Sequence, residues 1–150
     1  MTVTPDAAVH LVRTDQGRYL AMNRNGVEIE LGRGDDLFSP VDLLLAALAG
    51  CTALDVDLAT SRHAEPEVFN VGAAATRSDE GGNHLEDVHV TLSLRYPETS
   101  GGDRATAMVE RVIQLSHDKL CTVARTVEAG TPVDVRVKYG QPFRAVPKVS

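Results

Sequence analysis

The first third of the chain consists of three short apolar-rich runs separated by turn signals. The runs are Val9–Arg13, Tyr19–Asn23 and Val27–Leu31, and the segments TDQG and RNG lie between them. Short runs bounded by Gly, Asn and Asp are typical of antiparallel hairpins. The pair Asn25-Gly26 favours a type I′ turn, in which both central residues have positive φ. The pattern therefore predicts three strands joined by hairpins.

A long apolar segment follows and predicts a single helix. It reads SPVDLLLAALAGCTALDVDLATSR, residues 39–62. Ser39 is a favourable N-cap and Pro40 a favourable first helical residue, while Asp42 stands where a capping box places Glu or Gln, which predicts a partial box. We expect the helix to run to about Arg62. Its first half is apolar on every face, which predicts burial on more than one side.

Two strands are predicted next. Val68–Thr76 is an ambiguous strand because of its alanines, whereas Asp87–Tyr96 alternates cleanly between apolar and polar side chains. Residues 79–83 are predicted to form the turn between them.

The last part of the chain predicts two helices and one strand. Apolar residues from Ala105 to Ile113 follow helical spacing, with Asp103 as the expected cap. A break at SHDK precedes a short helix at Cys121–Glu128, which Gly130 closes. A final alternating strand is expected at Val133, Val135, Val137 and Tyr139.

Three strands, a long helix, two strands, two helices and one strand indicate an α+β fold with antiparallel sheets. The 150 residues fit a single domain, with a core from about residue 9 to residue 139 and an irregular tail over 140–150.

Composition narrows the classes of partner and site. The chain has 15 Lys+Arg against 21 Asp+Glu, a formal charge of -6, no Trp and 4% aromatic residues, which disfavours a nucleic-acid partner. The five histidines match no structural zinc spacing, so neither a metal nor another cofactor is expected. Residues 1–10 do not resemble a signal peptide, and the longest apolar run, Leu43–Leu54, is shorter than the roughly 20 residues that span a bilayer. We therefore expect a cytoplasmic protein without a membrane partner.

The first of the two cysteines, Cys51, lies deep inside the long predicted helix. Counted from Pro40 it is roughly 16 Å along the helix axis, beyond the reach of the helix dipole. Asp55 lies one turn later on the same face, and a nearby carboxylate disfavours a thiolate. Composition alone therefore favours a buried inert cysteine. A reactive Cys51 needs a cation from elsewhere, and the arginines before the helix are Arg13, Arg18, Arg24 and Arg33.

The second cysteine, Cys121, opens the short helix CTVARTVEAG. A helix N-terminus and the nearby Lys119 both favour a thiolate, so local physics predicts that Cys121 is the more acidic thiol. A buried cap residue is the alternative.

Both cysteine segments carry a resemblance to a known family. SPVDLLLAALAGC resembles the signature of the OsmC/Ohr family, and LSHDKLCTVARTV resembles the family's second cysteine motif. The two motifs occur in the family's order, and the resemblance extends from about residue 9 to residue 139. It looks closest to the YhfA-like branch.

The resemblance implies an intertwined homodimer in which antiparallel sheets surround a long buried helix. It implies a peroxiredoxin-like thiol peroxidase of oxidative or osmotic stress defence that reduces organic hydroperoxides. Cys51 would attack the peroxide and become a sulfenic acid, and Cys121 would close a disulfide, which an external dithiol such as a lipoyl protein would reopen.

One position departs from the family's pattern. Peroxidases of the family have Glu after the proline of the first motif, where it pairs with the catalytic arginine, and here that residue is Val41. Asp42 is one position later, about 100° around the helix. We expect Arg33 to activate Cys51, and Asp55 to orient that arginine.

Val41 keeps a second function open. The chain can instead be a stress-response binding module of the same fold, with little peroxidase activity and an apolar ligand at the dimer interface. Thiol-dependent acyl transfer is a third possibility, although no general base near Cys51 is evident from the sequence.

Overall fold

The computed structural model describes residues 5–140, and the chain divides into two compact units. One unit contains the chain up to Leu43 together with the chain from Asp134 onward, and the other is Leu44–Val133. The expected single domain stays a prediction, and residues 141–150 of the expected irregular tail lie outside the described residues.

The first unit contains the predicted three-stranded meander. Its strands are β1 (Val9–Asp15), β2 (Arg18–Asn23) and β3 (Glu28–Gly32), and they pair antiparallel in the order β1-β2-β3. The antiparallel sheet expected from the turn signals is therefore confirmed.

The predicted type I′ turn at Asn25-Gly26 is wrong. Gly26 has a φ of 78°, but Asp87 is the one non-glycine residue with positive φ within residues 5–140. The Asn23 side chain closes the loop instead, because its Oδ1 accepts the N–H groups of Asn25 at 2.9 Å and of Val27 at 3.0 Å. A three-residue loop with one left-handed glycine results, which is a common hairpin connection.

The long helix α1 is Pro40–Thr60, and its N-terminal capping box is complete rather than partial. The Ser39 N–H donates to Asp42 Oδ2 at 2.8 Å, and the Asp42 N–H donates to Ser39 Oγ at 3.1 Å. These bonds from the Ser39 backbone and hydroxyl lower the pKa of Asp42. Asp reaches back as Glu does in a capping box, so this carboxylate is committed to the start of the helix.

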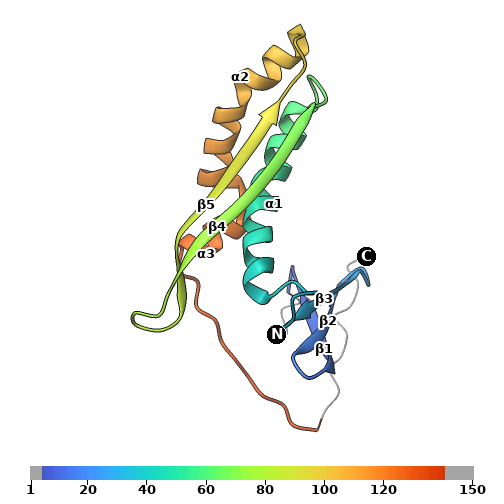
Figure 1. Cartoon of the computed structure of the whole chain (residues 1–150), viewed down its shortest axis with the longest axis vertical. Helices are drawn as coiled ribbons and strands as arrows, with labels where there is room; N and C mark the ends of the chain where they lie inside the picture. Colours follow the sequence, from blue (N-terminus) through green and yellow to red (C-terminus); the bar gives the residue numbers. More distant parts are fainter. Residues whose placement is uncertain (1–4, 141–150) are drawn as a thin grey trace. The chain divides into compact units, whose positions relative to one another are not determined.

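A long hairpin forms the sheet of the second unit. Strands β4 (Val68–Ser78) and β5 (His84–Arg95) pair antiparallel, and the register shifts between Ala74 and Thr76. The predicted turn is confirmed, since the Gly82 N–H donates to the Asp79 carbonyl oxygen at 3.1 Å. In Figure 1 the two strands run together as a long ribbon beside the helices.

Three helical segments follow β5. They are α2 (Ser100–Leu115), a π-helical turn η1 (Ser116–Leu120) and α3 (Thr122–Glu128). The expected cap of the first helix is wrong: Thr99 is the N-cap and its hydroxyl accepts the Gly102 N–H at 3.0 Å, while Asp103 lies in the first turn. The break predicted at SHDK is the π-helical turn.

The interior of the second unit includes a small cluster of hydrogen-bonded residues. Val56 and Thr60 on α1 are fully buried, and Tyr96 after β5 is 8% exposed. Thr60 Oγ1 donates to the Val56 carbonyl oxygen and accepts the Tyr96 hydroxyl, both at 2.8 Å. Each buried hydroxyl group therefore has a partner, as burial requires.

The expected final strand is wrong for this chain. Residues 131–138 have no regular structure, and the alternating apolar side chains Val133, Val135, Val137 and Tyr139 are exposed by 87%, 83%, 67% and 90%. A strand needs a neighbour for its backbone N–H and C=O groups, and none is paired with this segment in the described part of the chain.

Helix α1 is not buried on every side within one chain. Leu44, Leu54 and Leu58 are exposed by 40%, 62% and 66%. By length and hydropathy alone the 21 residues of α1 are enough to cross a membrane, although the apolar run Leu43–Leu54 within it is shorter than a span. A core helix passes the same test, and the complete burial of Val56 and Thr60 fits a core helix.

Candidate functional site

The structure brings the two cysteines together in the second unit. Cys51 is half-buried on α1, and Cys121 is 1% exposed as the N-cap of α3. Both are free thiols, and the Cys51 side chain is close enough to Cys121 to affect its titration. The sequence placed these residues 70 positions apart, and folding makes them neighbours.

The prediction that Cys121 is an acidic thiol is wrong. Burial raises the pKa of Cys121, and hydrogen bonding with the Cys51 side chain raises it further. The Ala124 N–H at the start of α3 donates to Cys121 Sγ at 3.3 Å and lowers the pKa, but this effect is smaller than that of burial. The helix N-terminus was visible in the sequence, whereas the burial was not.

A π-helical turn presents Cys121 to Cys51. The Cys121 N–H donates to the Ser116 carbonyl oxygen at 2.8 Å, which closes the i→i−5 ring of the turn. The Ser116 side chain is fully buried, and its hydroxyl donates to Asp55 Oδ2 at 2.6 Å. The observed partner of Asp55 is therefore Ser116, and the expected contact of Asp55 with an arginine stays a prediction.

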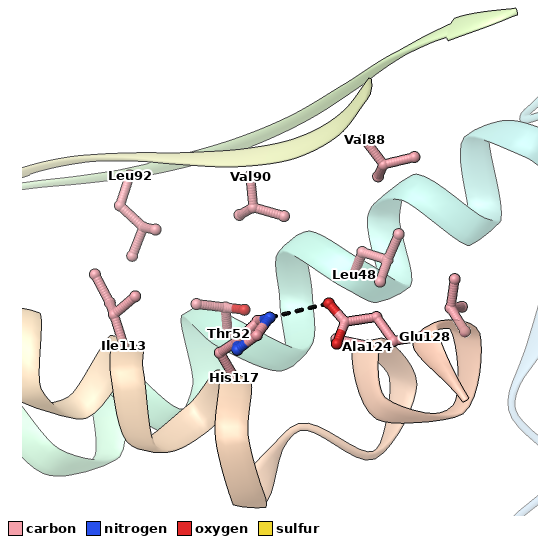
Figure 2. A pocket seen from close by; sticks show the side chains of 10 residues that line it. Leu48, Thr52, Val88, Val90, Leu92, Ile113, His117, Ala124 and Glu128 are labelled. Carbon is pink, nitrogen blue, oxygen red and sulfur yellow. Dashed lines mark hydrogen bonds and ion pairs between the residues drawn. The ribbon is translucent and has the colours of Figure 1, made fainter. Parts of the chain in front are cut away.

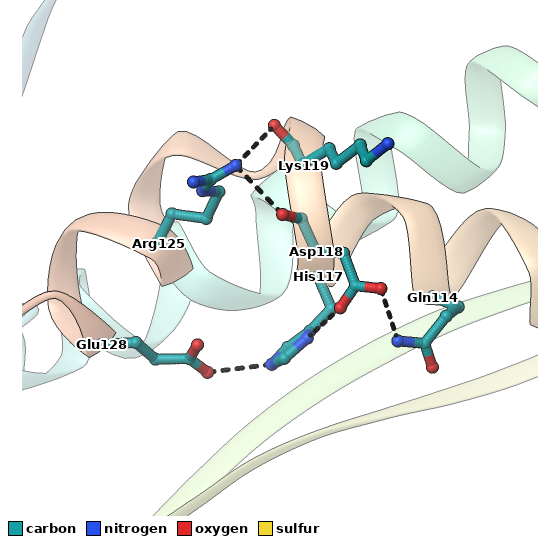
Figure 3. Close-up of polar contacts among 6 residues, drawn as sticks. All are labelled: Gln114, His117, Asp118, Lys119, Arg125 and Glu128. Atoms are coloured by element: carbon teal, nitrogen blue, oxygen red, sulfur yellow. Dashed lines mark hydrogen bonds and ion pairs between the residues drawn. The ribbon is translucent and has the colours of Figure 1, made fainter.

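The π-helical turn also makes a second set of polar contacts, with α2 and α3 (Figure 3). Arg125 Nη1 donates to the carbonyl oxygens of Asp118 at 3.0 Å and Lys119 at 3.4 Å. The His117 imidazole lies between Asp118 Oδ1 at 3.1 Å and Glu128 Oε1 at 2.9 Å. Both carboxylates, Asp118 first, raise the pKa of His117.

A pocket of about 310 Å³ lies within the second unit, and two residues of α1 close to Cys51 in sequence line it. Leu48 and Thr52, which flank Cys51 along α1, form part of its wall. Figure 2 shows apolar side chains of β5 pointing toward the helices, with the His117–Glu128 pair at one side. The apolar members of the lining are Leu48, Val88, Val90, Leu92, Ile113, Ala124 and Val127. Such a pocket can hold the apolar part of a small molecule.

The four candidate arginines before the helix differ in their partners. Arg18 forms a two-pronged ion pair with Asp36, with N–O distances of 3.2 and 2.8 Å. Arg24 has buried Nε and Nη2 atoms that find no hydrogen-bond partner among the described residues. Arg33 is exposed, and its backbone N–H donates to the Gly17 carbonyl oxygen at 2.8 Å. Arg33 and Cys51 belong to different units, so the expected role of Arg33 stays a prediction.

Three residues near the thiols were missed in the sequence. Ser116 and His117 were read as parts of a break between helices, and Glu128 as the end of the last helix. Their positions in SHDKL and at the end of TVARTVE gave no spacing signal, because the contacts join separate elements. Ser116 follows the helical pattern of α2, so the sequence predicts a cap there, and Ser116 is the C-cap of α2. Its contact with Asp55 is what the sequence did not indicate.

Comparisons with known proteins show which family this chain is similar to. A family model described as OsmC-like protein matches residues 32–136. An uncharacterized protein of Mycobacterium tuberculosis is 29% identical over 130 residues, which cover 83% of this chain and 91% of that protein.

Solved structures share the fold. An OsmC-like protein of unknown function from Vibrio cholerae matches with a TM-score of 0.63 and 16% identity, over 83% of this chain and 94% of that chain. An organic hydroperoxide resistance protein from Elizabethkingia anophelis matches with a TM-score of 0.52 and 20% identity, over 84% and 91% of the two chains.

Proposed function

Because the chain belongs to the OsmC-like protein family, we propose that it is a thiol-dependent peroxidase that reduces organic hydroperoxides. The observation that carries the proposal is the pairing of Cys51 with Cys121 in one chain. A solved relative in fold is named as an organic hydroperoxide resistance protein, which supports the same class of substrate.

In the first step, the Cys51 thiolate attacks the terminal oxygen of the hydroperoxide. The O–O bond breaks, the Cys51 sulfur is oxidised to a sulfenic acid, and the alkoxide leaves as an alcohol after taking up the proton that the thiol had released. The apolar pocket lined by Leu48 and Thr52 of the same helix suits the organic group of the substrate, since its walls are mostly aliphatic.

In the second step, the Cys121 sulfur attacks the sulfur of the Cys51 sulfenic acid. A disulfide forms, and the hydroxide that leaves combines with the Cys121 proton as water. An external dithiol, such as a lipoyl protein, then reduces the disulfide and is itself oxidised to a disulfide. The proximity of the two cysteines within one chain supports an intrachain bond.

The activating cation is proposed to come from the arginines that precede α1. Sequence reasoning favours Arg33. Arg24 is the alternative, because its buried Nε and Nη2 atoms have no hydrogen-bond partner among the described residues. The Asp42 carboxylate already accepts the Ser39 N–H at the start of α1. It is therefore not free to replace the glutamate that the family's peroxidases have at the position of Val41.

The pocket also supports a second candidate function. A stress-response binding module would hold an apolar ligand beside α1 and leave Cys51 reduced when peroxide is added. The aliphatic lining supports this alternative, because it can bind an apolar ligand. A binding function also needs no activated thiol.

The deciding experiment is the consumption of cumene hydroperoxide with dihydrolipoamide as reductant. We expect turnover by the wild-type protein, none by Cys51→Ser, and a dimedone-reactive sulfenic acid that accumulates in Cys121→Ser. No turnover by the wild type, together with a co-purifying apolar ligand in native mass spectrometry, would support the binding module instead.

A further inference from the structure

The hydrogen bond between Asp55 and Ser116 joins the two elements that carry the cysteines. We propose that Asp55 is a positioning residue that holds Cys121 against Cys51 for disulfide closure, an inference that rests on the proposed peroxidase function. Asp55 lies one helical turn after Cys51 on α1, and Ser116 begins the π-helical turn that ends at Cys121.

The bond is short and shielded from solvent on the serine side. Ser116 Oγ donates to Asp55 Oδ2 at 2.6 Å across 61 residues of sequence, and Ser116 is fully buried. A hydroxyl that donates to a carboxylate gives one of the stronger hydrogen bonds in proteins. The contact is therefore suited to fix the position of the Ser116 backbone as well as its side chain.

Ser116 transmits this position directly to Cys121. Its carbonyl oxygen accepts the Cys121 N–H at 2.8 Å, so the residue bonded to Asp55 is also the residue that closes the turn. A π-helical turn contains one residue more than an α-helical turn, which changes the direction in which the following residue points. Loss of the anchor would let this turn move as a unit and carry Cys121 away from Cys51.

The other hydrogen bonds of the turn do not reach α1 within the described residues. Gln114 of α2 donates to the Asp118 carboxylate, and Arg125 of α3 donates to the carbonyl oxygens of Asp118 and Lys119. Apart from the thiols themselves, the Asp55–Ser116 bond is the one hydrogen bond that connects α1 with segment 116–128 within the described residues. The hydrogen bonds with α2 and α3 preserve the shape of the π-helical turn. The Asp55–Ser116 bond instead fixes the position of the turn relative to Cys51.

The inference predicts that substitutions at the Asp55–Ser116 bond slow disulfide closure specifically. In Ser116→Ala, attack of Cys51 on cumene hydroperoxide should proceed at the wild-type rate. Disulfide closure should slow by roughly 10-fold to 100-fold in both Ser116→Ala and Asp55→Ala, because small misplacements of reacting groups are that costly. Rapid-quench mass spectrometry with dimedone measures the sulfenic acid and the disulfide separately. Asp55→Asn and Ser116→Thr keep an acceptor and a donor, so closure should largely recover.

Asp57 provides a matched control on the same helix. Its Oδ1 accepts the Ser61 hydroxyl at 2.7 Å, but this exposed pair does not touch the π-helical turn. Asp57→Ala should therefore close its disulfide at the wild-type rate. Wild-type closure in Asp55→Ala, or equal slowing in Asp57→Ala, would overturn the inference. If Asp55→Ala does not fold, the difference between Ser116→Ala and Ser116→Thr decides the matter.

A second measurement separates this inference from the proposed function. If the wild type does not react with peroxide, the Cys51–Cys121 disulfide can still be equilibrated in buffers of reduced and oxidised lipoamide and quantified by mass spectrometry. Asp55→Ala and Ser116→Ala should then lower the disulfide equilibrium constant by about 10-fold or more relative to Asp57→Ala. Equal constants in all variants would refute the positioning role whether or not the protein is a peroxidase.

Discussion

Cys121 shows at the scale of one residue how two environments compete for the same thiol. The Ala124 N–H at the start of α3 stabilises a negative charge on the sulfur, while burial opposes it more strongly, so the pKa of Cys121 is raised. A protonated Cys121 is compatible with a resolving thiol, which reacts second and can release its proton with the leaving hydroxide.

The rate of disulfide closure should therefore rise with pH. Because the pKa of Cys121 is raised, the thiol is mostly protonated near neutrality, and the thiolate fraction grows as pH increases above the ordinary cysteine value of about 8.5. Rapid-quench mass spectrometry from about pH 6 to about pH 9.5 checks this. A flat profile would contradict a closure limited by Cys121, and Cys121→Ser should form no intrachain disulfide at any pH.

A second prediction at this scale concerns the activating arginine. If Arg24 supplies the proposed activating cation, Arg24→Ala should slow alkylation of Cys51 by iodoacetamide about tenfold or more, because loss of a cation beside a thiol raises its pKa by about one unit or more. Arg24→Lys should retain part of the rate, and Arg33→Ala is the matched comparison. If Arg33→Ala has the larger effect, the sequence-based choice of Arg33 is correct and the choice of Arg24 is wrong.

At the scale of elements, helix α1 connects to its neighbours through a few polar contacts as well as through apolar packing. Thr60 near its C-terminus bonds to Tyr96 at the end of β5, and Asp55 in its middle bonds to Ser116. The polar residues of the helix that are buried therefore lie where another element supplies a partner.

The Thr60–Tyr96 hydrogen bond predicts that removing its acceptor and removing its donor lower the free energy of unfolding by different amounts. Thr60→Val leaves the nearly buried Tyr96 hydroxyl without its acceptor and should cost about 1–3 kcal/mol in the free energy of unfolding. Tyr96→Phe should cost less, since Thr60 keeps its bond to the Val56 carbonyl oxygen. Urea denaturation measures both, and the double mutant should lose less than the sum of the single changes. Additive losses would argue against the coupling.

The His117 pair between η1 and α3 predicts a pH-dependent stability. The pKa of His117 is raised by Asp118 and Glu128, so its stabilising contribution is complete below the unfolded value of about 6.5 and is lost as pH rises through the raised value. Asp118, whose pKa is lowered, stays ionised across this range. The wild type should exceed His117→Gln in urea midpoint at about pH 5.5 by more than at about pH 8.5.

A partner variant tests the origin of this effect. Glu128→Gln removes one of the two carboxylates that contact His117, so it should reduce the pH dependence without abolishing it. A His117→Gln difference that does not change with pH would show that the contacts do not favour the imidazolium.

At the scale of the whole molecule, many large apolar side chains remain uncovered. Leu54 and Leu58 of α1 are exposed by 62% and 66%, and the alternating segment from Val133 to Tyr139 is almost fully exposed. Exposed apolar surface of this extent is typical of surfaces that associate. It accords with the homodimer that the family resemblance implies, which stays a prediction.

Light scattering after size exclusion should give twice the 16.1 kDa mass of one chain. Val135→Asp places a charge in the exposed apolar alternation and should shift the protein toward the monomer, whereas Lys138→Gln changes a polar position of the same segment and should not. A monomeric wild type at micromolar concentration would contradict the predicted dimer.

The sequence by itself determined the order of the elements up to residue 128, the antiparallel α+β class and the two cysteine motifs. These depend on local periodicity, on caps such as Ser39 and on turn residues such as Gly82, which act between near neighbours along the chain. The ends of α1 and of the five strands were predicted within a few residues for the same reason.

Only the tertiary structure showed which residues surround the two cysteines of those motifs. The burial of Cys121, the contact of Asp55 with Ser116, and the lack of a strand paired with residues 131–138 in the part of the chain that the structure describes all depend on residues far away in sequence. Local rules correctly found the helix N-terminus at Cys121 but gave the wrong sign for its pKa, because desolvation is a property of the packed fold. The final alternating strand failed similarly, since alternation marks a segment that can pair but cannot supply its neighbour.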